Sequence, residues 1–521
     1  MKQLLWLATL AFAVVLSACG GGGGSTIPPP PPAGGFSVSS LKGYYAFSMS
    51  GLDTSGAYLA RTGSFVADGA GNITSAMEDV VDLSAGAPTE VTFAPGSYSV
   101  QANGRGVIVL KDNSGNGLTL TMVLQSSSQG FLLQTDTGLI GTGSLGSFNL
   151  QTTTDFAATA LNGNYIFDFS GESLTGATPT VVSTIGNISA TGNGIITGGV
   201  IDINDGNAGV SSAVNILPGS YTLDPANGAT FGRGTAVFAG HTFAFYIVDA
   251  TRIKFLQEDS QGGSSGDAFL QSGAIPTQDS GFTGSFAYLV GGSSTVGPDA
   301  AVARFAADGK GGIGAISYDE NNNGSLRHIS QGSNISNASY AIDTVNAGSG
   351  RGTFTFTDST NGTFTYVFYL ISPTSGVIQD VSSGFVADGT LLAQTGSSFT
   401  LAGLAGNYVF NWSGVDISSY SVENYVGQYA LANSASNNIS GVLDGTSLGI
   451  NGVASYPNSG VQGTLTINSG GSANNTYQIA AGSSVSPTYD FQAYIVDANT
   501  LLLVGTDKTR VLAGIVSRQS Q

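Results

Sequence analysis

The sequence predicts an all-β protein made of four tandem antiparallel modules of about eight strands each. Landmarks recur along the chain with a period near 120 residues, which indicates a repeated structural unit. Short runs of alternating apolar and polar residues are separated by Gly- and Asn-rich turns, the pattern of half-buried strands. Glycine numbers 77 and charged residues make up only 9% of the chain. No segment after the first twenty residues has the composition of a long helix.

Each module begins with a glycine and an aromatic strand. The first glycines are Gly43, Gly163, Gly284 and Gly406, which are spaced by 120, 121 and 122 residues. Aromatic residues two positions apart, such as Tyr45 and Phe47, point to the same face of an extended strand. We therefore expect each opening strand to bury one aromatic stripe.

A tight hairpin follows the opening strand. Residues 65–73 and 305–313 align position by position around Asp68-Gly69 and Asp308-Gly309. Asp-Gly between apolar runs is a strong turn signal, because glycine adopts positive φ without penalty. Residues 190–195 take this place in the second module, and residues 437–439 keep part of it in the fourth.

The short connections favour a meander over a crossed topology. Strands joined by tight turns are usually neighbours in the sheet. We expect each module to form an up-and-down meander, closed or nearly closed into a small barrel, because closure removes exposed strand edges. Immunoglobulin-like sandwiches are the alternative. The expected segments are a signal peptide (1–18), a lipidated cysteine with a Gly/Pro tether (19–38), and modules at 39–150, 158–275, 280–398 and 401–521.

The first twenty residues form an export signal. Lys2 precedes an apolar run at residues 4–16 that is too short to span a bilayer comfortably. Leu16-Ser17-Ala18-Cys19 resembles the lipobox of bacterial lipoproteins. That resemblance implies a diacylglycerol thioether on Cys19, cleavage before it and acylation of the new amine. Cys19 is the only cysteine, so no disulfide is expected within the chain.

The segment after Cys19 is expected to be a tether. Five glycines at 20–24 are flexible, and five prolines at 28–32 extend about 15 Å at roughly 3 Å per residue. By analogy with lipoproteins, Gly20 in place of Asp favours the outer membrane, facing either the periplasm or the outside. The whole mature layout also resembles a group of uncharacterised Gly-rich, tandem-repeat bacterial lipoproteins, which implies no activity.

Charge and composition exclude several functions. The net charge of −18 argues against nucleic acid and against docking of the body onto anionic lipid. The two histidines, His241 and His328, lie in different modules, which excludes a zinc site of His and Cys ligands. We interpret His241 as a turn residue and His328 as solvated, so we expect no catalytic residue. Gly262-Gly263-Ser264-Ser265-Gly266 fits a hydrolase G-x-S-x-G pattern, but we interpret it as a linker.

Two further patterns concern ligands. Asp319, Asn321 and Asn323 resemble the first half of a calcium loop, but its twelfth position is Ser330 instead of Glu. We therefore expect a polar loop and no metal, with weak calcium binding as the alternative. Trp412 takes the place of Phe169 and Met49 in earlier modules, which favours a core position over a stacking platform for sugar or lipid.

Gly-Arg-Gly recurs around Arg105, Arg233 and Arg351, and we expect Val461-Gln462-Gly463 to replace it in the fourth module. The sequence suggests structural ion pairs within each module rather than a carboxylate clamp for a ligand. The expected pairs are Arg105 with Asp136, Arg233 with Asp259, and Arg351 with Asp380.

These observations predict a membrane-anchored, non-enzymatic lipoprotein whose modules serve structural, adhesive or interaction roles at the cell envelope. Repeating one module on a stalk suits multivalent contact. The expected partners are the membrane, through the lipid, and a protein or glycan whose identity stays open; no cofactor is expected. The alternative is binding of a small ligand, a lipid or a sugar, inside barrel-like modules.

Overall fold

The computed structural model describes residues 35–136, 143–176, 178–329, 335–360, 362–396, 399–432, 437–449, 452–468, 472–480 and 488–520. Cys19, the tether up to residue 34 and Ser330 lie outside these residues. The prediction of an all-β fold with meander modules is confirmed. Modules 1 and 4 close into barrels of eight strands, and module 2 closes through the β10–β11 pairing with its fourth strand divided into β12 and β13. Module 3 is a curled, open sheet of nine strands.

Each module consists of consecutive strands. Module 1 contains β1 (Lys42–Leu52), β2 (Tyr58–Asp68), β3 (Asn72–Asp82), β4 (Thr89–Val100), β5 (Arg105–Asp112), β6 (Gly117–Ser126), β7 (Gln129–Gln134) and β8 (Leu145–Leu150). Module 2 contains β9 (Asn162–Ser173), β10 (Thr180–Thr191), β11 (Ile195–Asp205), β12 (Gly209–Ile216), β13 (Gly219–Leu223), β14 (Arg233–Phe238), β15 (His241–Asp249), β16 (Arg252–Gln257) and β17 (Gly262–Leu270).

The second half of the chain repeats this order. Module 3 contains β18 (Thr283–Ser294), β19 (Gly297–Asp308), β20 (Ile313–Asn322), β21 (Ser325–Ile329), β22 (Ile335–Ile342), β23 (Arg351–Asp358), β24 (Gly362–Ser372), β25 (Ser375–Asp380) and β26 (Phe385–Ala393). Module 4 contains β27 (Gly406–Asp416), β28 (Ser421–Leu431), β29 (Asn438–Gly449), β30 (Gly452–Ile467), β31 (Ser472–Ala480), β32 (Thr488–Ile495), β33 (Thr500–Gly505) and β34 (Arg510–Arg518).

Short helices connect the strands. They are η1 (Val38–Ser40), η2 (Thr153–Asp155), η3 (Ala158–Ala160), α2 (Gly228–Phe231), η4 (Asp279–Gly281) and α3 (Leu401–Leu404). The Asp-Gly hairpin forms as predicted: Gly69 has a φ of 81°, and the Asp68 carboxylate accepts hydrogen bonds from the N–H groups of Ala70 and Asn72 at 2.7 and 3.0 Å.

The fourth strand of a module is where the modules differ. Proline lacks the N–H that a sheet ladder needs, and Pro95 lies at a register shift within β4. In module 2, Pro218 separates β12 from β13, and β11 pairs with both. Module 3 has a similar break between β21 and β22, and an isolated bridge from Gly312 to Ser339 spans the open edge. The unclosed sheet of module 3 is thus a local variation on a barrel.

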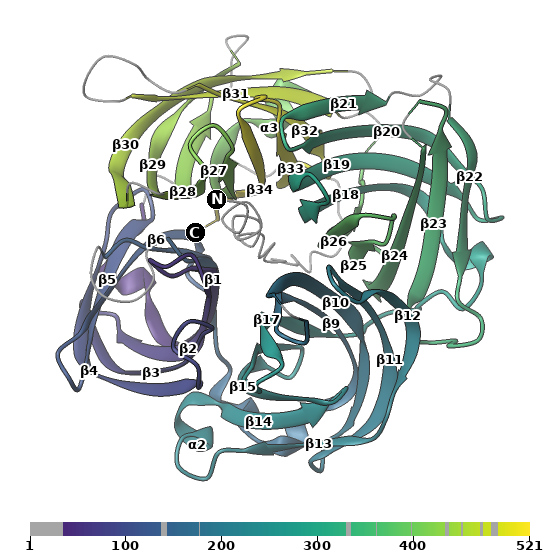
Figure 1. Cartoon of the computed structure of the whole chain (residues 1–521). Coiled ribbons are helices and arrows are strands. Elements are labelled where there is room, and N and C mark those ends of the chain that lie inside the picture. The colour runs from purple at the N-terminus through teal and green to yellow at the C-terminus, as the bar shows by residue number, and fades with distance from the viewer. Residues whose placement is uncertain are drawn as a thin grey trace.

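The four modules follow one another around a ring, and module 4 lies beside module 1 (Figure 1). Both faces of many strands are buried, which explains why so few residues are charged. The inner faces pack four aromatic-rich cores, one per module. Outer faces pack a separate apolar cluster at each of the four contacts between neighbouring modules. Trp412 is a core residue of module 4 and stacks on Phe410 with ring centroids 4.3 Å apart.

Candidate functional site

The arginines of the Gly-Arg-Gly turns hold neighbouring modules together. Arg233 donates from Nε and Nη2 to the two carboxylate oxygens of Asp79 in module 1, at 2.8 and 2.7 Å. Arg351 binds Asp202 of module 2 in the same way, at 2.8 and 2.9 Å. Arg105 of module 1 binds Asp444 of module 4, with both distances 2.6 Å. Such two-point contacts fix orientation as well as charge.

The predicted partners of these arginines, Asp136, Asp259 and Asp380, are therefore wrong. Ile108 and Leu110 point into core 1, so Arg105, three positions before Ile108, points outward. Asp136 lies at the opposite end of the barrel, where its carboxylate accepts from the Thr119 N–H at 3.0 Å. Strand parity turns each arginine out of its barrel towards a carboxylate of the preceding module in the ring. Arg233 and Arg351 also pair with Asp224 and Asp343 of their own modules.

Buried tyrosines reinforce two of these contacts. The hydroxyl of Tyr246 donates to Asp79 at 2.7 Å, and that of Tyr369 donates to Asp202 at 2.6 Å. Burial acts to raise the pKa of Asp202, but hydrogen bonds from Arg351, Ser212 and Tyr369 outweigh it and hold that pKa below its ordinary value. The carboxylate of Asp202 therefore stays charged inside the contact.

A glutamine after the last strand of each module ties it to the next. Nε2 of Gln151 donates to the Phe231 and Ile247 carbonyls at 2.9 and 2.6 Å. The same contact recurs from Gln271 to Ser349 and Leu370 (3.2 and 2.9 Å) and from Gln394 to Ile495 (2.7 Å). Gln519 returns to module 1, donating to Asn103 and Leu124 at 2.9 and 2.7 Å. Gln519 and Arg105 together close the ring.

The contact between modules 3 and 4 differs from the other three. Arg351 lies opposite Tyr369 in module 3, and the residue in the same position of module 4, opposite Tyr494, is Ser472. The expectation that Gln462 replaces the arginine is therefore wrong, because Gln462 lies one strand earlier, in β30. Here Asp319 accepts from the Tyr494 hydroxyl at 2.7 Å and contacts Nδ1 of His328 at 2.6 Å. Burial raises the pKa of Asp319, and the two hydrogen bonds oppose that rise.

The candidate calcium residues belong to this contact. Nδ2 of Asn321 donates to the carbonyls of Gly505, Asp507 and Arg510 of module 4 at 2.9, 2.9 and 2.7 Å. Its oxygen accepts from the Gly324 N–H, and Asn323 donates to the Val296 carbonyl at 2.8 Å. Among the described residues no group of three or more His, Cys, Asp and Glu side chains could hold a metal ion.

At one end, the interiors of modules 1, 3 and 4 hold buried ion pairs. Arg61 pairs with Glu78, Arg327 with Glu320, and Arg510 with Glu423. Large aromatic side chains, among them Tyr318 and Tyr425, pack beside the pairs of modules 3 and 4. These groups lie at the module ends next to the hairpins β1–β2, β18–β19 and β27–β28.

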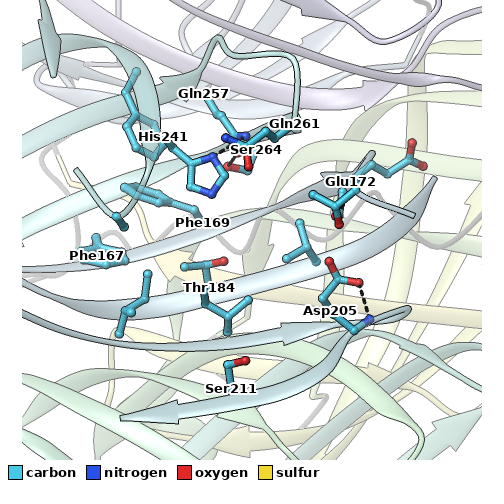
Figure 2. Close-up of a pocket in the computed structure, with 18 of the residues that line it drawn as sticks. Phe167, Phe169, Glu172, Thr184, Asp205, Ser211, His241, Gln257, Gln261 and Ser264 are labelled. Carbon is cyan, nitrogen blue, oxygen red and sulfur yellow. Dashed lines mark hydrogen bonds between the residues drawn. The ribbon is translucent and has the colours of Figure 1, made fainter. Parts of the chain in front are cut away.

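The corresponding end of module 2 contains a cavity of about 230 Å³ (Figure 2). Its apolar wall includes Phe167, Phe169, Phe238 and Phe243. His241, Gln257 and Ser264 form a polar group at the other side, where Ser264 Oγ donates to Gln257 Oε1 at 2.8 Å. His241 Nδ1 lies 3.1 Å from Asp259 Oδ2. Burial acts to raise the pKa of Asp259, but hydrogen bonds, including those from Thr242 and Gln261, hold it below its ordinary value.

Two interpretations of module 2 residues need correction. The segment 262–266 is not a linker, because it opens β17, which pairs with β9 and β16. His241 is the first residue of β15, not an isolated turn residue, and it lines the cavity. The sequence held a signal for this: His241, Phe243 and Phe245 alternate, which places them on one face. His328 is largely exposed, as expected, yet it contacts Asp319.

A second, larger cavity of about 820 Å³ lies where all four modules meet. It is lined by one end of every module, including Ser128, Thr251, Thr374 and Thr500. We call this end of the ring the proximal face, because the Gly-Arg-Gly turns and the first described residues also lie there. The N–H of Phe36 donates to the Ala102 carbonyl at 3.0 Å. The module 2 cavity opens on the opposite, distal face.

Comparison with known proteins gives little beyond this geometry. No protein-family model and no curated protein matches the chain. Among solved structures, Transferrin Binding Protein B of Haemophilus parasuis Hp5 matches with 9% identity, 75% of this chain and 83% of that chain covered, and a TM-score of 0.21. The corresponding protein of serogroup B Neisseria meningitidis is 9% identical, with 75% of this chain and 84% of that chain covered and a TM-score of 0.18. An AttH of Nitrosomonas europaea is 10% identical, with 73% of this chain and 98% of that chain covered and a TM-score of 0.15. With TM-scores this low, none of these likenesses carries an argument.

Proposed function

We propose that this chain is a lipoprotein, anchored through Cys19 to the outer membrane, that serves as a rigid, non-enzymatic interaction body at the cell envelope. The observation that carries the proposal is ring closure: Arg105 and Gln519 join the last module to the first. A closed ring fixes the relative positions of the distal turns that the structure describes, as a preorganised contact surface requires. No helix among the described residues is long and apolar enough to cross a bilayer.

The distal face is the surface that such a body would present to a partner. The chain enters the ring at Gly35 on the proximal face, so a short tether would turn the distal face away from the membrane. The first hairpins of modules 2, 3 and 4 each expose an apolar side chain there: Leu174 at 36%, Val296 at 57% and Tyr420 at 46% exposure. Apolar residues presented on separate tips suit multivalent protein or glycan contact.

Anchoring is tested by expressing the whole chain and its Cys19→Ala variant in a bacterium fed labelled palmitate. The unmodified chain is expected in the membrane fraction and labelled; the variant is expected to be unlabelled and released from the membrane. Equal labelling of both chains would contradict lipidation at Cys19.

The interaction role is tested with cells that carry the whole chain. A Leu174→Ala, Val296→Ala, Tyr420→Ala variant is expected to lose most cell-to-cell or cell-to-surface adhesion, because it removes the exposed apolar tips. A matched variant changes Val345, exposed at 90% in a different loop, to Ala and keeps adhesion. Unchanged adhesion in the triple variant, with unchanged thermal unfolding, would contradict the proposal.

Binding of a small ligand is the second candidate function, and one observation favours it. The described ends of modules 1, 3 and 4 hold buried ion pairs, whereas module 2 has a solvent-connected cavity. The chemistry of that cavity is specific enough to be argued separately.

A further inference from the structure

We propose that module 2 binds a small, uncharged molecule made of one aromatic ring with a hydroxyl group, a phenol in the simplest case, in the cavity at its distal end. This inference concerns a site separate from the lipid anchor and from the exposed hairpin tips. It narrows the small-ligand alternative to one module and one chemical class.

The cavity exists because module 2 lacks the side chains that fill its relatives. Register places Thr184 of β10 where β2 has Arg61 and β28 has Tyr425. It likewise places Ile201 of β11 where β3 has Glu78 and β20 has Tyr318. Both substitutions replace a long or aromatic side chain with a shorter one. The hole therefore occupies the space of the missing groups.

The size of the cavity limits the ligand. A buried apolar cavity of roughly 150 Å³ accommodates benzene. At about 230 Å³, the module 2 cavity has room for one six-membered ring and a small substituent. Drug-sized ligands and lipids need roughly 300 to 1,000 Å³. A full acyl chain or a disaccharide is therefore too large.

The apolar wall favours an aromatic ring. Phe238 and Phe243 stack with centroids 4.7 Å apart, and Phe169 lies 5.3 Å from Phe243. Phe167 stacks on Phe169 at 4.8 Å, so the wall is a continuous aromatic cluster. Contacts between aromatic rings are favourable beyond the apolar area that they bury. A planar ring can extend this cluster.

The polar side favours a hydroxyl group. Figure 2 shows His241, Gln257 and Ser264 grouped together, with His241 beside Phe169. Asp259 anchors both His241 Nδ1, at 3.1 Å, and Gln257 Nε2, at 3.0 Å, and so fixes the orientation of these side chains. With Nδ1 engaged, the second ring nitrogen of His241 is left as the group of the imidazole that a ligand can reach. A hydroxyl both donates and accepts, so it suits an imidazole nitrogen and a serine equally.

The charges around the cavity disfavour an ionised ligand. No Lys or Arg lines it, so an anion finds no counter-charge. Asp205, one of two carboxylates in the lining, already accepts from the N–H groups of Asn207 and Ala208 and from the Thr180 hydroxyl. Glu172, the other carboxylate, is buried, so pairing it with a cationic ligand would require both charges to leave water, which is costly.

The mouth of the cavity gives solvent access. Ala208, Gly209, Ser211 and Gln261 belong to the lining and are exposed. Ala208 and Gln261 lie in the connections β11–β12 and β16–β17, and Gly209 and Ser211 lie at the start of β12, all at the distal end of the module. A ligand can therefore enter without opening the barrel or the ring.

Calorimetric titration of the lipidated chain in lipid nanodiscs tests the proposal, with phenol, toluene, benzoate and benzylamine as probes and empty nanodiscs as the partition control. Phenol is expected to bind with one site per chain and about tenfold more tightly than toluene, which leaves the polar side unpaired. Benzoate and benzylamine are expected to bind at least tenfold more weakly than phenol.

Two variants fill the cavity with side chains taken from the same register positions. Thr184→Tyr copies Tyr425, and Ile201→Tyr copies Tyr318; each is expected to abolish the phenol signal while thermal unfolding stays cooperative. Val237→Tyr, on the exposed outer face of the same barrel, is the control and keeps binding. The proposal would be overturned if the two filled variants bound phenol as tightly as the unmodified chain, if the unmodified chain did not bind phenol, or if benzylamine bound more tightly than phenol.

Discussion

The contact between modules 1 and 2 and the contact between modules 3 and 4 solve one problem with different chemistry. In the first, Asp79 is held by a permanently charged guanidinium and by Tyr246. In the second, Asp319 is held by Tyr494 and by the imidazole of His328. The same carboxylate position thus binds a tyrosine in both contacts, together with an arginine in one and a histidine in the other. What the repeat preserves is an acceptor that faces the next module.

The difference teaches which part of a contact is essential. Both contacts also have an apolar cluster and a glutamine tie, from Gln151 and Gln394. An ion pair adds little over an apolar contact of equal shape, because removing both charges from water is costly. The clusters and glutamine ties therefore hold the ring, and the arginine fixes orientation.

The largest effect is expected from breaking one half of the buried ion pair. Asp79→Ala leaves the Arg233 guanidinium, whose side chain is 9% exposed, without its two-point partner, although Asp224 still pairs with it. We expect a loss of about 3 kcal/mol in the free energy of unfolding. Asp319→Ala, which strands no arginine, is expected to cost about 1 kcal/mol. Chemical denaturation of both variants measures the two values.

A double variant separates charge from shape. Asp79→Leu combined with Arg233→Met removes both charges and keeps apolar volume, so its stability is expected to return to within about 1 kcal/mol of the unmodified chain. A double variant as unstable as Asp79→Ala would show that the ion pair itself stabilises the ring.

The fold could be predicted from sequence because its signals are local. Aromatic residues two apart, Asp-Gly turns and the spacing from Gly43 to Gly163 all lie within short windows or repeat exactly. The alternation of side chains along a strand could also have shown that Arg105 points out of its barrel, since Ile108 and Leu110 point into it. It could not have named Asp444, because that residue is 339 positions away and only packing of whole modules brings it close.

The cavity of module 2 was harder to predict, because it arises where module 2 has shorter side chains than the other modules at the same register positions. Thr184 and Ile201 are ordinary strand residues, and their significance appears only when register aligns them with Arg61 and Glu78. The contacts of Asn321 were hard to foresee for a related reason, because its Nδ2 donates to three carbonyls of module 4. Composition alone cannot tell whether an amide presents its oxygen to an ion or its nitrogen to the next module.

A smaller effect is expected at the contact that closes the ring. Modules 4 and 1 have no chain connection through this contact, whereas Gln394 ties modules that the chain already links. Gln519→Ala is expected to lower the free energy of unfolding by about 1–2 kcal/mol, because it removes hydrogen bonds to two carbonyls, of which that of Leu124 is buried. Hydrogen exchange is expected to accelerate in β5 and β34, at the closing contact. Gln394→Ala is the matched control, and equal exchange in both variants would contradict a special role for closure.

The smallest effect compares the pH dependence of two equivalent carboxylates. The pKa of Asp202 is lowered in the folded chain, so its contribution to stability grows as pH rises towards the ordinary value of 3.8. The pKa of Asp319 is raised, so the folded chain binds the extra proton and this contribution falls as pH rises above 3.8. Unfolding free energies of the unmodified chain, Asp202→Asn and Asp319→Asn, measured across this range, isolate each carboxylate. The unfolding free energy of the unmodified chain minus that of Asp202→Asn should increase with pH, and the corresponding difference for Asp319→Asn should decrease. If both differences changed with pH in the same direction, histidine and arginine would hold the carboxylate alike.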